Sequence, residues 1–249
     1  MSRISLDRVG HAYFGRTVLD AVSMRIEAGE CVALLGPSGS GKTTLLQIAS
    51  GLVTPLRGQV KRRYRRHAMV FQDPRLLPWA TAADNIGFGL RQRGVRRAER
   101  DARIADVAGL VDLNHDDLEK YPVELSGGMR QRVAIARALA VQPDFVFLDE
   151  PFSALDVGLR RRLQQLVLER LLGHRAGLFF VTHDLVEAVQ IAHRILVLSA
   201  DGSGLAGERQ PDGIPLQRDA RSAFDLAETY LATDPLFADL NNVENRRAV

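Results

Sequence analysis

One eight-residue segment has the composition and spacing of a loop that binds phosphate groups. The segment that fits the pattern G-x-x-x-x-G-K-[ST] is Gly36-Pro37-Ser38-Gly39-Ser40-Gly41-Lys42-Thr43. Glycines allow successive backbone N–H groups to turn inward around an anion, and the helix that follows presents its positive N-terminal end to the same anion. In such a loop Lys42 contacts the β- and γ-phosphates, and the Thr43 hydroxyl is a Mg²⁺ ligand. The segment therefore predicts a site for ATP and Mg²⁺, in which we include the adjacent Thr44.

Two carboxylates at the end of an apolar segment form a second candidate for chemistry. Asp149 and Glu150 directly follow Phe145-Val146-Phe147-Leu148, which has the composition of a buried strand. Ligands of parallel sheets bind beyond the carboxyl ends of the strands. We expect Asp149 to hold Mg²⁺ through water and Glu150 to act as the general base toward the attacking water. An acidic strand end means little by itself, but together with the phosphate loop it predicts ATP hydrolysis.

An α/β arrangement is required to position these residues. Apolar segments typical of buried strands lie at 31–35, 68–71, 145–148, 178–181 and 195–198. Helical patterns lie at 42–50, about 82–93, 96–109, 128–140, 158–172, 184–192 and 222–232. Strands and helices that alternate in this way predict crossover connections and a mostly parallel sheet. Alternating apolar residues at 4–6 and 18–26 predict a further β part at the N-terminus.

The composition is that of an ordinary globular protein. The 249 residues are 46% hydrophobic and 25% charged, and the net charge of +3 is too small to indicate a nucleic-acid partner. The single cysteine, Cys31, excludes an internal disulfide and is interpreted as a small buried hydrophobe. The N-terminal residues lack the apolar region of a signal peptide, and no stretch approaches the roughly 20 apolar residues of a membrane helix. We expect a soluble chain of cytoplasmic type that docks on a membrane partner.

The segment Leu125-Ser126-Gly127-Gly128-Met129-Arg130-Gln131-Arg132 resembles the LSGGQ signature of ATP-binding cassette (ABC) ATPases. It stands about twenty residues before the acidic strand, as in that family. Other segments resemble the remaining family motifs, in the family's order. Gln72 after Met69-Val70-Phe71 is similar to the Q-loop, Ser153-Ala154-Leu155-Asp156 to the D-loop, and Val181-Thr182-His183-Asp184 to the switch-histidine loop. The resemblance covers residues 1 to about 225.

The resemblance implies a fold and a domain organisation. The fold is a P-loop NTPase (RecA-like) core with a mainly parallel sheet, an N-terminal antiparallel β part and a helical insertion subdomain. The whole chain would be one ABC ATPase domain. Within it, residues 1–75 and 140–200 would form the nucleotide-binding core, 76–139 the helical subdomain and 201–249 a C-terminal extension.

The resemblance also implies roles for individual residues. Two copies would form a head-to-tail dimer, in which each ATP contacts the phosphate loop of one copy and the signature of the other. The implied catalytic residues are Glu150, His183, Gln72 and Lys42, with His183 sensing the γ-phosphate. The implied Mg²⁺ ligands are Thr43, Gln72 and Asp149. Further ATP contacts would come from Ser126, Gly127, Gly128 and Asp156.

Two positions bear on how the nucleotide is contacted: the aromatic residue that would stack on adenine, and the fifth residue of the signature. Tyr13 stands 29 residues before Lys42 and fits the family's adenine-stacking aromatic residue, but the adjacent Phe14 is an alternative. Met129 replaces the glutamine of LSGGQ, so one side-chain hydrogen bond expected there is absent. We expect this replacement to alter the nucleotide contact without abolishing activity.

The segment Phe71-Gln72-Asp73-Pro74-Arg75-Leu76-Leu77-Pro78-Trp79 looks like the import-type ATPases of the nitrate, sulfonate and taurine group. Leu76, Leu77 and Trp79 would line a groove for a helix of a membrane partner, or would pack the helical insertion. The implied partners are a second copy or a paralogous ATPase, transmembrane permease subunits and, indirectly, an extracytoplasmic solute-binding protein. The implied location is peripheral, on the cytoplasmic face of the inner membrane.

Two basic runs do not belong to these motifs. The runs are Lys61, Arg62, Arg63, Arg65, Arg66 and Arg91, Arg93, Arg96, Arg97, Arg100. A solvated face is the favoured interpretation, and attraction to anionic lipid or to nucleic acid are the alternatives. An ATPase of an exporter or lipid-trafficking complex would share all the core motifs. A soluble ABC ATPase acting on nucleic acid usually has two cassettes or a long coiled coil, which this chain lacks, and the complete set of catalytic residues argues against a catalytically silent partner.

Overall fold

The computed structural model describes residues 2–152, 157–201, 203–238 and 240, which group into two compact units. Unit 1 comprises Met1–Tyr64 and Gly177–Val249, and unit 2 comprises Arg65–Ala176.

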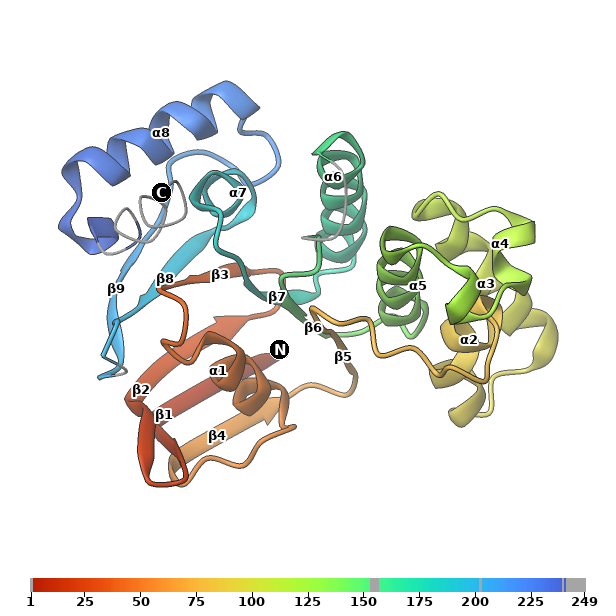
Figure 1. The fold of residues 1–249 in the computed structure, drawn as a ribbon, viewed down its shortest axis with the longest axis horizontal. Helices are drawn as coiled ribbons and strands as arrows, with labels where there is room; N and C mark the ends of the chain where they lie inside the picture. The colour runs from red at the N-terminus through yellow and green to blue at the C-terminus, as the bar shows by residue number, and fades with distance from the viewer. Residues whose placement is uncertain (1, 153–156, 202, 239, 241–249) are drawn as a thin grey trace. The chain divides into compact units, whose positions relative to one another are not determined.

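A three-stranded antiparallel sheet begins unit 1. It consists of β1 (Arg3–Tyr13), β2 (Arg16–Glu27) and β4 (Arg57–Arg63), in the order β2-β1-β4 (Figure 1). Alternate residues of β1 and β2 point to one buried face, where Ile4 pairs with Ile26 and Leu6 with Met24. This period-two burial confirms the antiparallel β part predicted at the N-terminus.

Parallel strands form the centre of unit 1. Strand β3 (Cys31–Leu35) lies between β7 (Gly177–Val181) and β8 (Arg194–Leu198) and is parallel to both. Residues of β3 and β7 are buried throughout, as expected of strands covered on both faces. Strand β9 (Leu205–Arg209) adds an antiparallel edge to β8. The connecting helices include α1 (Lys42–Ser50) and α7 (Leu185–Ile191).

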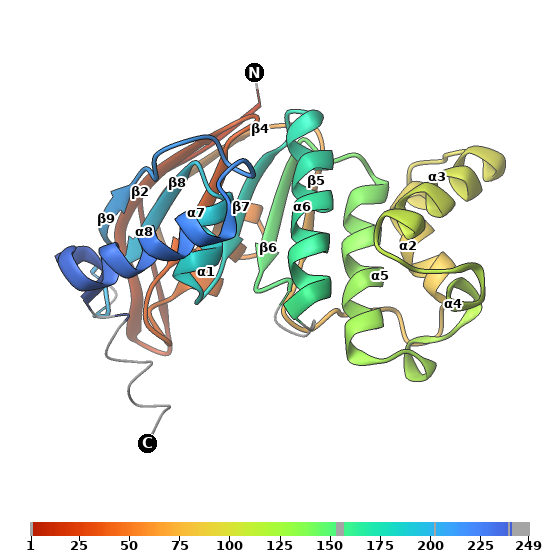
Figure 2. The same ribbon diagram turned by 90° about the horizontal axis from the view of Figure 1, so that it is seen from above.

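The C-terminal part of unit 1 packs on this core. Helix α8 (Ala220–Thr233) lies alongside α7, and a short 3-10 turn, η2 (Pro235–Phe237), follows it (Figures 1 and 2). Phe237 is fully buried and stacks on Tyr230 with 5.2 Å between the ring centroids. The Arg218 guanidinium donates to backbone carbonyls on both α7 and the loop before α8. These contacts explain why this irregular part of the sequence is ordered.

Unit 2 combines a strand pair with a group of helices. Strand β5 (His67–Val70) is parallel to β6 (Phe145–Asp149). The helices are α2 (Ala82–Gln92), α3 (Arg97–Leu110), α4 (His115–Glu119), α5 (Gly127–Ala140) and α6 (Val157–Gly173), and a 3-10 turn, η1 (Pro122–Glu124), precedes α5. Helix α5 packs against α2 and α3. The helical insertion predicted from the sequence is therefore confirmed (Figure 2).

The elements agree closely with the sequence-based expectations. Five strands (β3, β5, β6, β7 and β8) have a parallel partner and β9 pairs antiparallel to β8, so the prediction of an α/β fold with a mainly parallel sheet is confirmed. Strand β9 and helix α4 were not predicted. Within the described residues, no helix is both long and apolar enough to cross a membrane. The proposed boundaries at 75, 139 and 200 remain predictions.

Candidate active site

The predicted phosphate loop connects β3 to α1 in unit 1. The Lys42 ammonium donates to the carbonyls of Gly36 (2.8 Å) and Pro37 (2.9 Å), so its side chain lies back along the loop. Ser38 and Gly39 are exposed at the tip, whereas Ser40 is buried. Because the loop follows the carboxyl end of β3, it lies at the edge of the sheet where ligands of parallel sheets bind.

The glycines of this loop are required by its shape. Gly36, Gly39 and Gly41 have φ angles of 152°, 83° and 96°, which side chains rarely adopt. A Cβ atom on Gly41 would lie 2.9 Å from Val18 Cγ1, because β2 packs directly against the loop. A Cβ atom on Gly36 would lie 2.9 Å from Ser40 Oγ and 3.0 Å from the Leu198 carbonyl oxygen. Space and backbone conformation together therefore exclude larger residues at both positions.

The N-terminus of α1 fits an anionic ligand. Its N-cap is Gly41, no side chain caps the helix, and its first turn contains no acidic residue. The positive end of the helix dipole is thus left for an external anion. Ser40 Oγ is buried and has no hydrogen-bond partner in the described part of the chain. The loop therefore has the features that the phosphates of ATP require, and Thr43 and Thr44 lie in the first turn of α1 beside it.

His183 follows the parallel strand β7 in the same unit. The preceding Thr182 is buried, and its backbone N–H donates to the Leu34 carbonyl at 3.3 Å, which holds this chain end beside the end of β3. Asp184 caps α7 by accepting from the Glu187 N–H at 3.0 Å. His183 itself is exposed between these two fixed residues. It therefore lies at the same sheet edge as the phosphate loop, as the sequence predicted.

Both candidate aromatic residues lie at the β1–β2 hairpin. Tyr13 is 42% exposed, and its ring packs edge-on against His11 with 4.7 Å between the centroids. Phe14 is fully exposed in the turn and has a left-handed φ of 49°. Since β2 also contacts Gly41, this hairpin is attached to the phosphate loop. Both rings are exposed and available to a base.

In unit 2 the ends of β5 and β6 bring Gln72 and Glu150 together. The two strands are parallel and pair Val70 with Leu148, so the residues that follow them emerge at one edge. Gln72 Nε2 donates to Glu150 Oε2 at 3.3 Å. Asp149, the last residue of β6, is 5% exposed. The structure thus places the predicted base beside the predicted Q-loop glutamine.

Glu150 has an unusual backbone conformation. Its φ of 45° lies in the left-handed region, which is uncommon for residues other than glycine, asparagine and aspartate. Such strain persists only where the surroundings enforce it, and it is found preferentially at functional sites. Here the conformation turns the chain away from β6 directly after Asp149, which leaves Glu150 half-buried next to Gln72.

The signature segment forms the start of α5. Ser126 is the N-cap, and its hydroxyl accepts from the Met129 N–H at 3.2 Å. The first helical turn has no acidic residue, and Ser126 and Gly127 are exposed. A Cβ atom on Gly127 would meet only the Arg130 guanidinium, 4.0 Å away. Nothing within the described chain therefore requires glycine at this position, which is consistent with an external group approaching the helix end.

The structure thus groups the predicted residues by unit. Unit 1 holds the phosphate loop with Lys42, Thr43 and Thr44, together with His183 and the aromatic pair, and unit 2 holds Gln72, Asp149, Glu150 and the signature. Asp156 and the rest of the segment 153–156 lie outside the described residues.

The basic runs have partly structural roles. Arg62 donates to the carbonyls of Ile48 and Ala49 at the C-terminal end of α1, with 2.9 Å from its Nε to the Ala49 oxygen. Arg66 and Arg93 donate to the Val141 carbonyl after α5. Cations at these positions complement the negative ends of the helices. Lys61, Arg63 and Arg65 are exposed, which agrees with the interpretation as a solvated face.

A fold of this class, with a glycine-rich phosphate loop after β3 and a second helix that begins at an LSGG segment, defines an ATP-binding cassette. The family model described as "ABC transporter" matches residues 19–153. The chain belongs to the ATP-binding subunits of ABC transporters, which are ATPases.

Sequence matches to curated relatives cover most of the chain. It is 44% identical over 215 residues to the aliphatic sulfonates import ATP-binding protein SsuB 1 of Pseudomonas syringae pv. syringae, covering 86% of this chain and 88% of that protein. It is 45% identical over 213 residues to the taurine import ATP-binding protein TauB of Mesorhizobium japonicum, with 82% of each chain covered.

Solved structures are similar as well. A dimeric post-hydrolysis state of the cassette MJ0796 bound to ADP and Pi has a TM-score of 0.76 and 30% identity, and the match covers 85% of this chain and all (100%) of that one. The structure of an ATP-binding subunit of an ABC transporter has a TM-score of 0.79 and 26% identity, with 96% of this chain and 99% of that one covered. These likenesses confirm the predicted fold.

Proposed function

We propose that this protein is the ATPase subunit of an ABC importer, acting as a head-to-tail dimer beneath membrane-embedded permease subunits. The observation that carries this proposal is the presence of two helix N-termini with no acidic residue in the first turn: that of α1, which begins after Gly41 and has no side-chain cap, and that of α5, which is capped by the Ser126 hydroxyl. A single mononucleotide loop needs only the first. At the second helix N-terminus, the packing of the described chain does not require glycine at position 127. We infer that an ATP held by another copy approaches this helix end.

Different residues are assigned to the phosphates, the base and the metal ion of Mg-ATP. The backbone of residues 36–41 and the Lys42 ammonium bind the phosphates, while Tyr13 or Phe14 stacks on the base. As the family resemblance implies, Thr43, Gln72 and Asp149 would supply oxygen ligands of the kind that Mg²⁺ prefers. Bound there, Mg²⁺ would neutralise charge on the phosphate oxygens.

The hydrolytic step is assigned to the residue after β6. Glu150 takes the proton of the attacking water as general base. The Gln72 amide donates to the carboxylate of Glu150, which fixes its orientation. His183 lies at the edge of the sheet where the phosphate loop begins, and it is assigned the contact with the γ-phosphate.

Dimerisation would complete each site. Ser126, Gly127 and Gly128 of one copy, together with Asp156, would contact the ATP bound in the phosphate loop of the other. The dimeric cassettes among the similar structures support this arrangement. ATP acts as a ligand that favours the closed dimer, because only the closed dimer offers both helix ends to its γ-phosphate.

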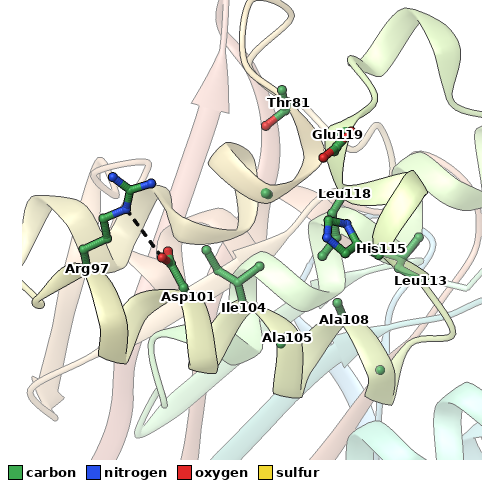
Figure 3. A pocket seen from close by; sticks show the side chains of 12 residues that line it. Thr81, Arg97, Asp101, Ile104, Ala105, Ala108, Leu113, His115, Leu118 and Glu119 are labelled. Carbon is green, nitrogen blue, oxygen red and sulfur yellow. Dashed lines mark ion pairs between the residues drawn. The ribbon is translucent and has the colours of Figure 1, made fainter.

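A pocket in unit 2 is a suitable place for a permease helix to dock. It has a volume of about 750 Å³ and lies between α3, the start of α2 and the α4 segment (Figure 3). Its apolar lining includes Ile104, Ala108 and Leu118, and an ion pair between Arg97 and Asp101 (3.6 Å) stands at its margin (Figure 3). Small and aliphatic side chains leave room for the apolar face of a helix.

Exposed aromatic surface precedes this pocket in the chain. Trp79 is 75% exposed, and Thr81, two residues later, lines the pocket. Leu76 and Leu77 are half-buried, and the Leu77 N–H is bonded to Asn85 Oδ1 at 2.8 Å. Of the three residues predicted to line a groove, Trp79 is thus the most accessible to a partner.

The proposed solute class rests on the relatives. Both curated relatives described above are import proteins, for aliphatic sulfonates and for taurine. We therefore place the transported solute among small sulfonates and related anions such as nitrate, delivered by an extracytoplasmic binding protein. The subunit would work peripherally at the cytoplasmic face of the inner membrane.

Reconstitution with the permease tests this function. The permease that co-purifies with the chain, placed in vesicles with its solute-binding protein, should show ATP hydrolysis that rises when taurine or an alkanesulfonate is added on the binding-protein side. Stimulation by lipid or by nucleic acid in place of the small anion would contradict the importer assignment and favour an exporter or a soluble cassette.

A further inference from the structure

The segment from Phe71 to Thr81 has no regular secondary structure, yet side chains of two helices hold its backbone. It connects β5 to α2 and contains Gln72 and Trp79. The fully buried Asn85 side chain on α2 accepts from the Leu77 N–H (2.8 Å) and donates to the carbonyls of Leu77, Ala80 and Thr81 at 3.0–3.2 Å. The second half of the segment is therefore fixed to α2.

Helix α5 holds the first half of the segment. Arg137 donates to the Pro74 carbonyl at 2.8 Å and to the Arg75 carbonyl at 3.0 Å. Gln131, which is 1% exposed, donates to the Phe71 carbonyl at 3.3 Å. The Arg75 guanidinium lies over the Phe71 ring at 4.0 Å, which closes the turn between these anchor points.

Arg137 is half-buried, and its side chain bonds to the backbone of the segment. Burial lowers the pKa of its guanidinium, and the acceptors of its hydrogen bonds in the described part of the chain are two neutral carbonyls. Removing a cation from water without a carboxylate partner is costly, so an apolar residue of equal size would satisfy packing better. The two hydrogen bonds hold these carbonyls at defined positions relative to α5.

Gln72 lies between these anchor points. Its neighbour Phe71 is bonded to Gln131, and Pro74, two residues further on, is bonded to Arg137. The backbone of Gln72 is therefore constrained on both sides by α5, while its side chain donates to Glu150. The same helix begins at the signature residue Ser126.

We propose that Arg137 is a positioning residue for hydrolysis. By holding the carbonyls of Pro74 and Arg75 on α5, it fixes the place from which Gln72 reaches Glu150. It also makes the signature helix and the Gln72 segment move as one element. The inference rests on the proposed function, since it assigns Arg137 a role only through Gln72.

A double-mutant cycle tests this role. In the full-length protein, Arg137→Met keeps an unbranched side chain, although a shorter and uncharged one, and removes both hydrogen bonds. It should lower kcat for Mg-ATP about 10-fold, because a small displacement of a catalytic group has effects of this order, and should leave KM within about twofold. Gln72→Ala should lower kcat by itself. In the Gln72→Ala background, Arg137→Met should have less than about twofold further effect, since two residues of one unit are not additive.

Two further variants separate positioning from stability. Arg103 also donates to two backbone carbonyls, those of Leu139 and Ala140 at 3.3 Å, but it does not contact the segment 71–81. Arg103→Met removes these two hydrogen bonds and also the ion pair with Asp106 (2.7 Å), yet it should leave kcat within about twofold of the wild type. Arg137→Lys, which keeps the charge and can reach one carbonyl, should recover part of kcat.

The outcomes distinguish the inference from the proposed function. If Gln72→Ala lowers kcat but Arg137→Met does not, or if the two losses multiply in the double variant, Arg137 is not a positioning residue. If Gln72→Ala itself leaves kcat unchanged, the proposed role of Gln72 in hydrolysis is wrong, and the assignment of Arg137 fails with it.

Discussion

Glu150 combines an assigned catalytic role with a backbone conformation that eight other non-glycine residues of the described chain share. It is the carboxylate assigned as the base, and its backbone is in a left-handed conformation with φ of 45°. A glycine at this position would relieve the strain but would remove the carboxylate. The backbone energy of such a conformation is of order 1–3 kcal/mol.

Glu150→Gln should separate ATP binding from hydrolysis. The amide keeps the size of the side chain and its oxygen can still accept from Gln72 Nε2, but it cannot take a proton from water. We expect hydrolysis to fall at least about 100-fold while the Kd for Mg-ATP stays within a few-fold. Phosphate release and nucleotide binding by equilibrium dialysis measure both quantities. Glu169→Gln, on the exposed side of α6, is the matched control, and steady-state hydrolysis intact in Glu150→Gln would show that the base lies elsewhere.

The chemistry-bearing residues were predictable from sequence because each stands in a local motif. Lys42 follows its glycines directly, and Glu150 directly follows an apolar strand. Arg137 and Gln131 could not be found in this way. Their partners are backbone carbonyls about sixty residues earlier in the chain, and a carbonyl leaves no signal in the sequence. The left-handed backbone of Glu150 could not be predicted from the sequence either, because it depends on the direction in which the chain continues after β6.

Among the elements, the phosphate loop makes the sharpest stability prediction, because two of its glycines differ in their surroundings. Both Gly39 and Gly41 have left-handed φ angles, but a Cβ atom on Gly39 would meet nothing within 4 Å, whereas one on Gly41 would lie 2.9 Å from Val18 Cγ1. Gly39→Ala should lower the free energy of unfolding by about 1–2 kcal/mol, the ordinary cost of that backbone region. Gly41→Ala should cost more and should also displace the loop from β2.

Urea unfolding and nucleotide affinity check this pair. We expect ATP to bind Gly41→Ala much more weakly than it binds Gly39→Ala. Equal losses of stability and of affinity in the two variants would mean that backbone conformation alone, without the contact to β2, requires glycine in this loop.

The start of β3 should make stability depend on pH. The Cys31 N–H donates to His193 Nδ1 at 3.0 Å, which requires the neutral imidazole. Burial lowers the pKa of His193 below its usual 6.5, with Arg218 acting in the same direction and Glu30 opposing it. The unfolded chain then binds more protons than the folded one just below pH 6.5, so the free energy of unfolding falls as the pH drops through this range.

His193→Gln offers the comparison. Its side-chain oxygen can still accept from the Cys31 N–H, but it does not titrate. Urea unfolding between pH 7 and pH 5 should show a smaller loss of stability in this variant than in the wild type. Carboxylates shared by both proteins contribute equally, so identical pH profiles would contradict the assignment.

Elements were predictable where burial makes the pattern simple. Strands β3 and β6 are buried at every residue, and their bounds follow from the apolar runs. Strand β9 has the sequence Leu-Ala-Gly-Glu-Arg, which has low strand propensity, and it exists because β8 offers an edge for pairing. Helix α4 spans only His115–Glu119, too short for a periodic pattern, and a capping box of Asn114 and Asp117 stabilises it.

At the scale of the whole molecule, a head-to-tail dimer predicts complementation between two inactive variants. Lys42→Ala removes the phosphate-loop cation, and Ser126→Arg blocks the start of the signature helix. Each variant alone should hydrolyse little ATP. In the mixed dimer, the intact loop of one copy faces the intact signature of the other. Random mixing should then restore about a quarter of the wild-type rate, since half the dimers would be mixed and each would have one complete site.

Measurement of phosphate release after mixing the two proteins without nucleotide and then adding Mg-ATP tests this prediction. Retained wild-type affinity for ATP in Lys42→Ala would contradict the assignment of the loop. No recovery on mixing, with dimers present by sedimentation, would show that the signature does not complete the site of another copy.

The exposed Trp79 gives the molecule a built-in spectroscopic label. It is the only tryptophan in the sequence, and it lies in the segment that side chains of α2 and α5 hold. Protein made with 5-fluorotryptophan should therefore give a single ¹⁹F resonance. Adding unlabelled permease in lipid nanodiscs should shift or broaden this resonance if Trp79 contacts the permease. An unchanged resonance in a complex that co-purifies would place the docking surface elsewhere. A single fluorine atom is therefore sufficient to detect binding of the permease at this segment.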